Sequence, residues 1–201
     1  MTNFLSGLRG KRNLSCSCFY RPVIIGIIFL LFAVSCKKEE PSPTPSDEIT
    51  LSSKTFGTQP YYSEGYSFET QEFYPRISSG TEIDIYLNEL LKVNGEPIGV
   101  QFSTNTISES TFGFYLNFEG TDLNSASEYF NNYSEAFAPD YVTLTDTIRE
   151  FQVYTFRTWK SNYVKFFVKE IRVIKEEDVI EYLEVDIKYF IQRNGSKNLG
   201  I

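Results

Sequence analysis

The chain has 201 residues, contains no histidine, and has one methionine, Met1, and three cysteines. Histidine is the usual general base at neutral pH and the commonest zinc and copper ligand, and His or Met usually holds haem iron. The composition therefore excludes a histidine general base, zinc or copper held by histidine, and haem iron held by histidine. The formal net charge of −7 argues against nucleic-acid binding, which requires a basic face.

A short apolar run at residues 23–34 follows a basic segment and precedes Cys36. The run has about half the length needed to cross a ~30 Å hydrocarbon core, so it predicts a secretion signal and not a permanent span. It resembles a bacterial lipoprotein signal, in which the cysteine is diacylated on its sulfur and becomes the first mature residue. The lipobox usually has Leu where this chain has Ala33. We expect residues 1–35 to be a signal peptide, Cys36 to be lipidated, and the protein to lie in the outer membrane or at the cell surface.

Removal of this leader would take away Arg9, Lys11, Arg12 and Arg21 and no acidic residue, so the formal charge would fall from −7 to −11. Cysteines occur only in the leader or at its edge, which leaves the exported domain without a thiol. Residues 36–50 are rich in Pro, Ser and charge and predict a semi-rigid tether. Its charged start, 37–40, is either a surface-sorting signal, as in lipoproteins of Bacteroidetes-type bacteria, or a solvated linker.

The remaining residues, 51–201, predict a single, mainly β, antiparallel domain. Apolar residues alternate with polar ones at 66–74, 82–87 and 112–118, which indicates strands with one buried face. Asn94-Gly95 predicts a type I′ turn, because both residues tolerate positive φ. Further strands are expected at 150–158, 163–174 and 179–192, and an antiparallel meander is their simplest topology.

One segment has a helical period. Between residues 122 and 137 the apolar side chains recur at spacings of three and four, which places them on one helical face. Asp122 or Thr121 is suited to the N-cap, and Pro139 is expected to end the helix. We therefore predict one short α-helix near 122–137. Its apolar face comprises Leu123, Ala126, Phe130, Tyr133 and Phe137.

The last hairpins resemble a known family. The runs at 154–171 and 182–199, with Tyr163-Val164-Lys165 and Gln192-Arg193-Asn194-Gly195-Ser196, are similar to the C-terminal half of the HmuY-like haem-binding lipoproteins of Bacteroidetes. Residues 65–70 are similar to the first strand of that family's domain. The resemblance implies an antiparallel β-rich fold and haem held by axial His or Met side chains. This chain has no histidine and no methionine beyond Met1, so those ligands have no counterpart here.

Tyrosine is the conventional haem ligand that remains. Tyrosines in alternating strands are usually packing partners, whereas Tyr61, Tyr62 and Tyr141 lie in expected loops and are the candidate ligand-binding residues. Trp159, the single tryptophan, lies in an expected polar turn. Its ring either folds back onto the sheet or is exposed for a haem edge, a sugar or a protein.

The sequence shows no other catalytic or metal-binding signature. The acids at 176–178 lack the spacing of a calcium loop and predict a solvated turn. Two carboxylates in a cleft, as in glycoside hydrolysis, remain an alternative, since the fold can bring any two of the 26 acids together. We interpret the protein as a non-catalytic, lipid-anchored binding module for haem or another planar ligand. The alternative is an adhesive or structural surface protein that contacts a glycan or a protein, such as an outer-membrane transporter.

Overall fold

The computed structural model describes residues 47–56, 63–76, 83–104, 112–137 and 140–200, which belong to one compact unit, Glu40–Ile201. Within them the chain is mainly β and has one α-helix, as predicted. The described helix is not long and apolar enough to span a membrane. The elements are β1 (Asp47–Ser52), β2 (Glu64–Ser67), β3 (Glu72–Pro75), β4 (Ile85–Leu91), β5 (Pro97–Ser103), β6 (Gly113–Glu119), α2 (Leu123–Asn132), β7 (Gln152–Arg157), β8 (Tyr163–Glu176) and β9 (Val179–Gln192).

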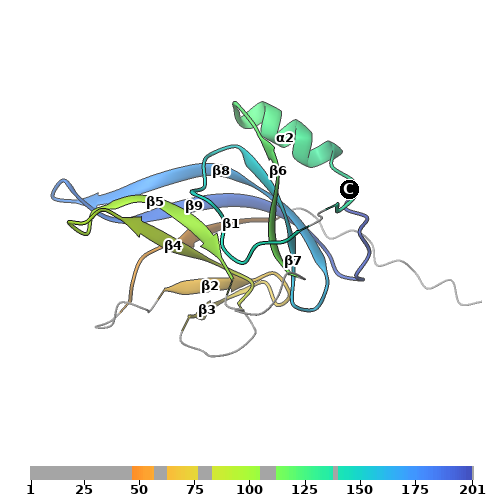
Figure 1. The fold of residues 1–201 in the computed structure, drawn as a ribbon, viewed down its shortest axis with the longest axis horizontal. Coiled ribbons are helices and arrows are strands. Elements are labelled where there is room, and N and C mark those ends of the chain that lie inside the picture. The colour runs from red at the N-terminus through yellow and green to blue at the C-terminus, as the bar shows by residue number, and fades with distance from the viewer. Residues whose placement is uncertain (1–46, 57–62, 77–82, 105–111, 138–139, 201) are drawn as a thin grey trace, which may run out of the picture. The chain divides into compact units, whose positions relative to one another are not determined.

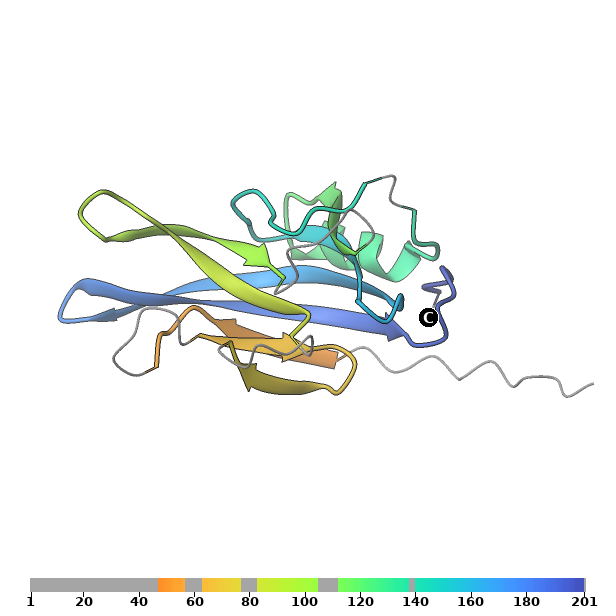
Figure 2. The ribbon, with the colours of Figure 1, turned by 60° about the horizontal axis from the view of Figure 1, so that its bottom comes forward.

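The strands form two antiparallel sheets (Figure 1). Sheet A has the order β1-β9-β8-β7-β6, and sheet B has the order β3-β2-β4-β5. The expected meander of the last three strands is confirmed, since β7 pairs with β8 and β8 with β9. The two sheets pack face to face, and α2 covers the outer face of sheet A (Figure 2).

Alternation along the long strands creates two apolar layers. On β9, Leu183, Val185, Ile187, Tyr189 and Ile191 all face the layer between the sheets, as the sequence predicted. The side chain of Phe190 points to the opposite face of sheet A and packs under α2. Successive side chains of a strand point to opposite faces, so β9 serves both layers.

The first strand begins earlier than the sequence indicated. β1 starts at Asp47, inside the expected tether at 36–50, and pairs with β9 from Asp47↔Tyr189 to Ser52↔Glu184. Leu51 is buried in the inter-sheet layer and Ile49 packs against it. Backbone pairing with a long partner strand therefore recruits residues whose local composition looks like linker.

The strand expected at 66–74 is instead a hairpin. β2 and β3 pair with each other, and the chain reverses at 68–71, where Gln71 has φ +61° and donates its backbone N–H to the Ser67 carbonyl at 2.8 Å. Phe68 is fully buried at the start of this turn. Asp84 fixes the turn by accepting the Phe68 N–H at 2.8 Å. Aromatic and polar residues continue to alternate through the turn, so the sequence pattern gives no sign that the chain reverses there.

The type I′ prediction at Asn94-Gly95 is wrong. Of that pair only Gly95 has positive φ, +84°, and Gly95 N donates to Lys92 O at 2.9 Å, which is a type I turn followed by a left-handed glycine. Two consecutive positive φ values, the mark of type I′, occur instead at Glu177 and Asp178 between β8 and β9. The acidic cluster there is thus a tight hairpin turn.

A bulge in β6 changes which face its side chains cover. The register with β7 shifts between Leu116 and Phe118, so Phe114 faces the inter-sheet layer while Phe118 packs under α2. Phe118 stacks on Tyr129 of the helix with ring centres 4.5 Å apart. An extra residue inverts the alternation, which explains why the expected single buried face at 112–118 was only half right.

Helix α2 starts as predicted and ends earlier. Asp122 is the N-cap and accepts the Ser125 N–H at 2.8 Å, in a capping box with Ser125. The helix ends at Asn132, well before residue 137, because the following backbone pairs with the C-terminal segment instead. Leu199 N donates to Ser134 O and Ala136 N donates to Lys197 O, each at 2.7 Å.

Candidate functional site

The structure describes two of the predicted site residues. Tyr141 is half-buried and packs against the apolar layer under α2. Burial raises the pKa of its phenol, and the nearby Tyr163 and Tyr133 add to the effect. The ring of Tyr141 is therefore part of this apolar layer and lines neither the groove nor the cavity described below. The other candidates, Cys36, Tyr61 and Tyr62, lie outside the described residues.

Trp159 occupies the β7–β8 turn, as expected, and its side chain remains 42% exposed. The Lys160 ammonium lies 4.9 Å from the centre of its ring. Glu69 fixes this turn from sheet B, since its carboxylate accepts Thr158 Oγ1 at 2.6 Å and Asn162 Nδ2 at 2.9 Å. The exposed indole is therefore carried on a rigid support.

A groove of about 410 Å³ lies between the ends of two hairpins, β4–β5 and β8–β9. Both hairpins extend to the same side of the sandwich, on the left in Figures 1 and 2. Val179, 62% exposed, provides an apolar wall. The remaining lining residues are Asn94, Gly95, Glu96, Lys175, Asp178 and Ile180.

Charged groups line the rim of this groove. Lys92 lies 2.7 Å from the Glu96 carboxylate and lowers the pKa of that carboxyl, and Lys175 adds to the shift from the other hairpin. The groove therefore combines apolar surface with one lining cation, Lys175, and two lining carboxylates, those of Glu96 and Asp178. Its described lining has no His, Met, Cys or Tyr, the usual protein ligands of haem iron.

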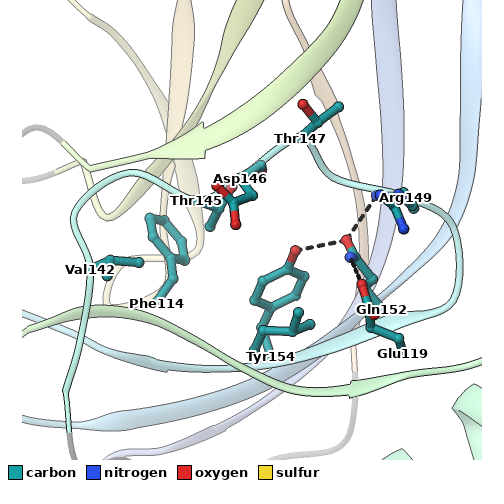
Figure 3. Close-up of a pocket in the computed structure, with 10 residues that line it drawn as sticks. Phe114, Glu119, Val142, Thr145, Asp146, Thr147, Arg149, Gln152 and Tyr154 are labelled. Carbon is teal, nitrogen blue, oxygen red and sulfur yellow. Dashed lines mark hydrogen bonds between the residues drawn. The ribbon is translucent and has the colours of Figure 1, made fainter.

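A second cavity, of about 180 Å³, lies beside β6 and β7 under the segment 142–149 (Figure 3). This segment hydrogen-bonds to both sheets: Val142 exchanges backbone hydrogen bonds with Phe114 of β6, and Ile148 N donates to Val100 O of β5 at 2.9 Å. Gly113 permits the close approach, because a Cβ there would lie 2.3 Å from Val142 O. The segment thus bridges the sheet edges and forms one wall of the cavity.

Polar groups on the cavity's other side form a connected chain (Figure 3). Gln152, 4% exposed, accepts hydrogen bonds from Tyr154 Oη and from the Arg149 N–H, both at 2.8 Å. Its Nε2 donates to the Glu119 carboxylate, also at 2.8 Å. Burial raises the pKa of Tyr154, and the charges of Glu119 and Asp146 add to this. Tyr154 therefore stays a neutral hydroxyl.

Sequence reasoning did not find this cavity. Its polar residues come from β6, the 142–149 segment and β7, and no local motif connects them. The bulge at Asn117 and the segment 142–149, which joins the sheet edges, bring these residues together. Neither feature has a sequence signal of its own.

In the described part of the chain, no group of three or more His, Cys, Asp or Glu side chains is placed to hold a metal ion. A scan against protein-family models found no match. A search of curated proteins also found none. The geometry of the groove and the cavity, together with the leader sequence, is therefore the basis for a functional assignment.

Proposed function

We propose that this chain is a lipid-anchored envelope lipoprotein whose β-rich domain binds a planar ligand, of haem type or similar, without catalysis. The observation that carries the proposal is the groove between the two hairpin ends, with an apolar wall at Val179 and a cation at Lys175. The resemblance to the HmuY-like lipoproteins supports the same ligand class. The leader with Cys36 supports anchoring at the outer membrane or cell surface.

The groove has the size of a small-molecule site. It is open along the two hairpin turns, and its volume lies within the ~300–1,000 Å³ of typical small-molecule sites. Val179, which lines the groove, is strongly exposed and would lose contact with water on binding. A flat macrocycle would place its apolar face on Val179 and its acidic substituents near Lys175 and away from Glu96 and Asp178, which also line the groove.

The groove offers apolar surface for the plane of a macrocycle, but its described lining has no ligand for iron. Tyr141 is packed elsewhere, and the described groove residues include no conventional axial ligand. We therefore expect binding through the porphyrin plane, so that haem and iron-free protoporphyrin IX bind with similar affinity.

This proposal is tested by titrating the full chain in detergent micelles with haem and with protoporphyrin IX, using matched protein-free micelles as the blank. We expect a saturable change in Soret absorbance for both. Val179→Asp places a charge on the apolar wall and should weaken both ligands at least about tenfold. Leu123→Asp is the matched control, since Leu123 is 45% exposed at the first turn of α2, where an acid is favourable.

Two outcomes would change the assignment. If micromolar protein gives only the free-ligand spectrum for both compounds, planar-ligand capture is wrong. If Tyr61→Phe or Tyr62→Phe abolishes the haem signal and leaves the iron-free porphyrin unaffected, the iron has a tyrosine ligand and the groove argument fails. Tyr141→Phe should leave both titrations unchanged.

A second candidate function is contact with a partner at the cell surface, such as an outer-membrane transporter. The exposed Trp159 ring on its fixed turn favours it, since rigid amphipathic aromatics are enriched at protein contacts. Trp159 is the sole tryptophan, so its fluorescence reports any such contact directly.

A further inference from the structure

The cavity of Figure 3 has a built recognition surface that the planar-ligand proposal does not use. Its volume of about 180 Å³ corresponds to roughly six water molecules at ~30 Å³ each. That is too small for a macrocycle and suits a ligand of about one six-membered ring. The cavity is framed by segments that are hydrogen-bonded to both sheets, so its shape is set before a ligand arrives.

One side of the cavity offers a fixed set of hydrogen-bonding groups. Gln152 is buried, and three hydrogen bonds fix its amide, which in turn orients the Glu119 carboxylate. Asp146 faces the same space from the segment 142–149, and Arg149 adds a guanidinium at the rim. Two carboxylates and one guanidinium make the polar lining of the cavity rich in acceptors, with one strong donor.

The lining also includes apolar side chains. Leu116 and Val142 are 39% and 48% exposed, and Phe114 is fully buried. Leu116 reaches this surface because it precedes the bulge of β6. The cavity therefore needs a ligand with carbon–hydrogen groups on one face and several hydroxyl groups along an edge.

Electrostatics and size narrow the ligand class further. An anion such as phosphate would meet two carboxylates, Glu119 and Asp146, against one guanidinium. An alkyl chain would leave the carboxylates and Gln152 without ligand partners, which is costly when water is displaced. A sugar ring satisfies both sides, since adjacent hydroxyls donate to a carboxylate and accept from Arg149, while its CH face covers Leu116 and Val142.

We propose that this cavity binds one neutral monosaccharide unit, as a free sugar or as the terminal unit of a glycan. The binding is independent of the planar-ligand groove, because the two sites share no residue. A ligand of about twelve heavy atoms is expected to bind with a Kd of about 2 mM.

The test uses the full chain in a sugar-free detergent and follows backbone amide NMR shifts at Arg149 and Gln152. The probes are glucose, galactose, mannose and N-acetylglucosamine, each added to about 100 mM, which is roughly fiftyfold over the expected Kd. We expect at least one sugar to give saturable shifts. Asp146→Ala and Leu116→Asp, both at exposed positions, should each weaken that sugar at least about tenfold.

Matched variants and a second probe make the result decisive. Asp140→Ala removes an exposed acid outside the cavity, and Leu123→Asp alters an exposed leucine on α2, so both should leave sugar binding unchanged. The proposal is overturned if no sugar gives saturable shifts, or if Asp146→Ala and Leu116→Asp bind as the parent does. It is also overturned if tetramethylammonium binds and the neutral sugars do not, since the cavity would then recognise a cation.

Discussion

At the scale of single residues, Asp84, which directly precedes β4, is a buried acid. It is 1% exposed, accepts the Phe68 N–H at 2.8 Å and lies 3.4 Å from Ser67 Oγ. Its other carboxylate oxygen, Oδ1, has no hydrogen-bond partner among the described residues. Burial raises the pKa of Asp84 to about 7, and the charge of Glu69 adds to this. The folded state therefore holds a proton that an exposed Asp would lose near pH 4.

This pKa shift predicts a specific pH dependence. Between about pH 4 and pH 7 the folded protein binds the Asp84 proton and the unfolded chain does not, so stability should fall as pH rises through this window. At 1.36 kcal/mol per unit, the effect has an upper limit of about 4 kcal/mol. Asp84→Asn keeps an acceptor for Phe68 and cannot ionise, so urea unfolding of the variant should lose this decline.

The control for this experiment is Asp140→Asn at an exposed position, which should follow the parent at every pH. Equal pH slopes for Asp84→Asn and the parent would show that Asp84 has an ordinary pKa in the folded state.

At the scale of elements, helix α2 depends on a buried lysine. Lys165 of β8 is fully buried, and its Nζ donates to the carbonyls of Phe130 and Tyr133 at 2.8 Å each. These carbonyls lie at the C-terminal end of the helix, where backbone acceptors lack partners and a positive charge is favourable. The ammonium also lies 4.8 Å from the centre of the Phe130 ring. Lys165 thus joins the helix to sheet A.

Replacing this lysine should weaken that attachment. Lys165→Met retains most of the apolar stem but leaves two carbonyls unsatisfied, so we expect a loss of about 1–3 kcal/mol in unfolding free energy at pH 7. Faster hydrogen exchange of the α2 amides should accompany the loss. Lys169→Met, which removes a surface ion pair with Glu48, is the control and should cost at most about 1 kcal/mol.

The pH dependence gives a second check on Lys165. Burial lowers the pKa of its ammonium to about 8, below the ~10.4 of an exposed lysine. Between these values the unfolded chain binds more protons than the folded protein does. The unfolding free energy of the parent should therefore rise from about pH 8 to pH 10, and this gain should be lost when the pH is lowered again. This rise should be absent from Lys165→Met, and its persistence would contradict the assignment.

At the scale of the whole molecule, the groove and the cavity lie at different places where elements of both sheets meet. The groove lies where two hairpins extend past the sandwich, and the cavity lies where the segment 142–149 joins the sheet edges. Ten residues separate Cys36 from the start of β1 at Asp47. If Cys36 carries lipid, both features would be displayed by a domain attached to a membrane through this short segment.

Anchoring is tested by expression in a bacterium that processes lipoproteins. The parent chain should incorporate labelled palmitate and partition into the detergent phase of Triton X-114. Cys36→Ser should do neither, since the acylated sulfur is absent. Cys16→Ser and Cys18→Ser alter cysteines inside the expected leader and should behave as the parent does. An unlabelled parent chain, or a labelled Cys36→Ser variant, would contradict the proposed anchor.

Sequence patterns correctly predict the mainly antiparallel β fold, the β7–β8–β9 meander, the buried face of β9 and the start of α2. These features follow from alternation, helical spacing and capping, which act between residues close in the chain. The sequence also placed Trp159 in a hairpin turn. Tyr61 and Tyr62 remain predictions.

Features that depend on distant backbone partners could not be predicted from local sequence patterns and are seen only in the tertiary structure. Pairing of Ser134 and Ala136 with the C-terminal segment ends α2, β9 recruits Asp47 into a strand, and the bulge near Asn117 turns Phe118 towards the helix. The cavity has the same origin, because its groups are brought together by these pairings. A local pattern records which face of an element is apolar, but it does not record which remote segment satisfies that element's backbone hydrogen bonds.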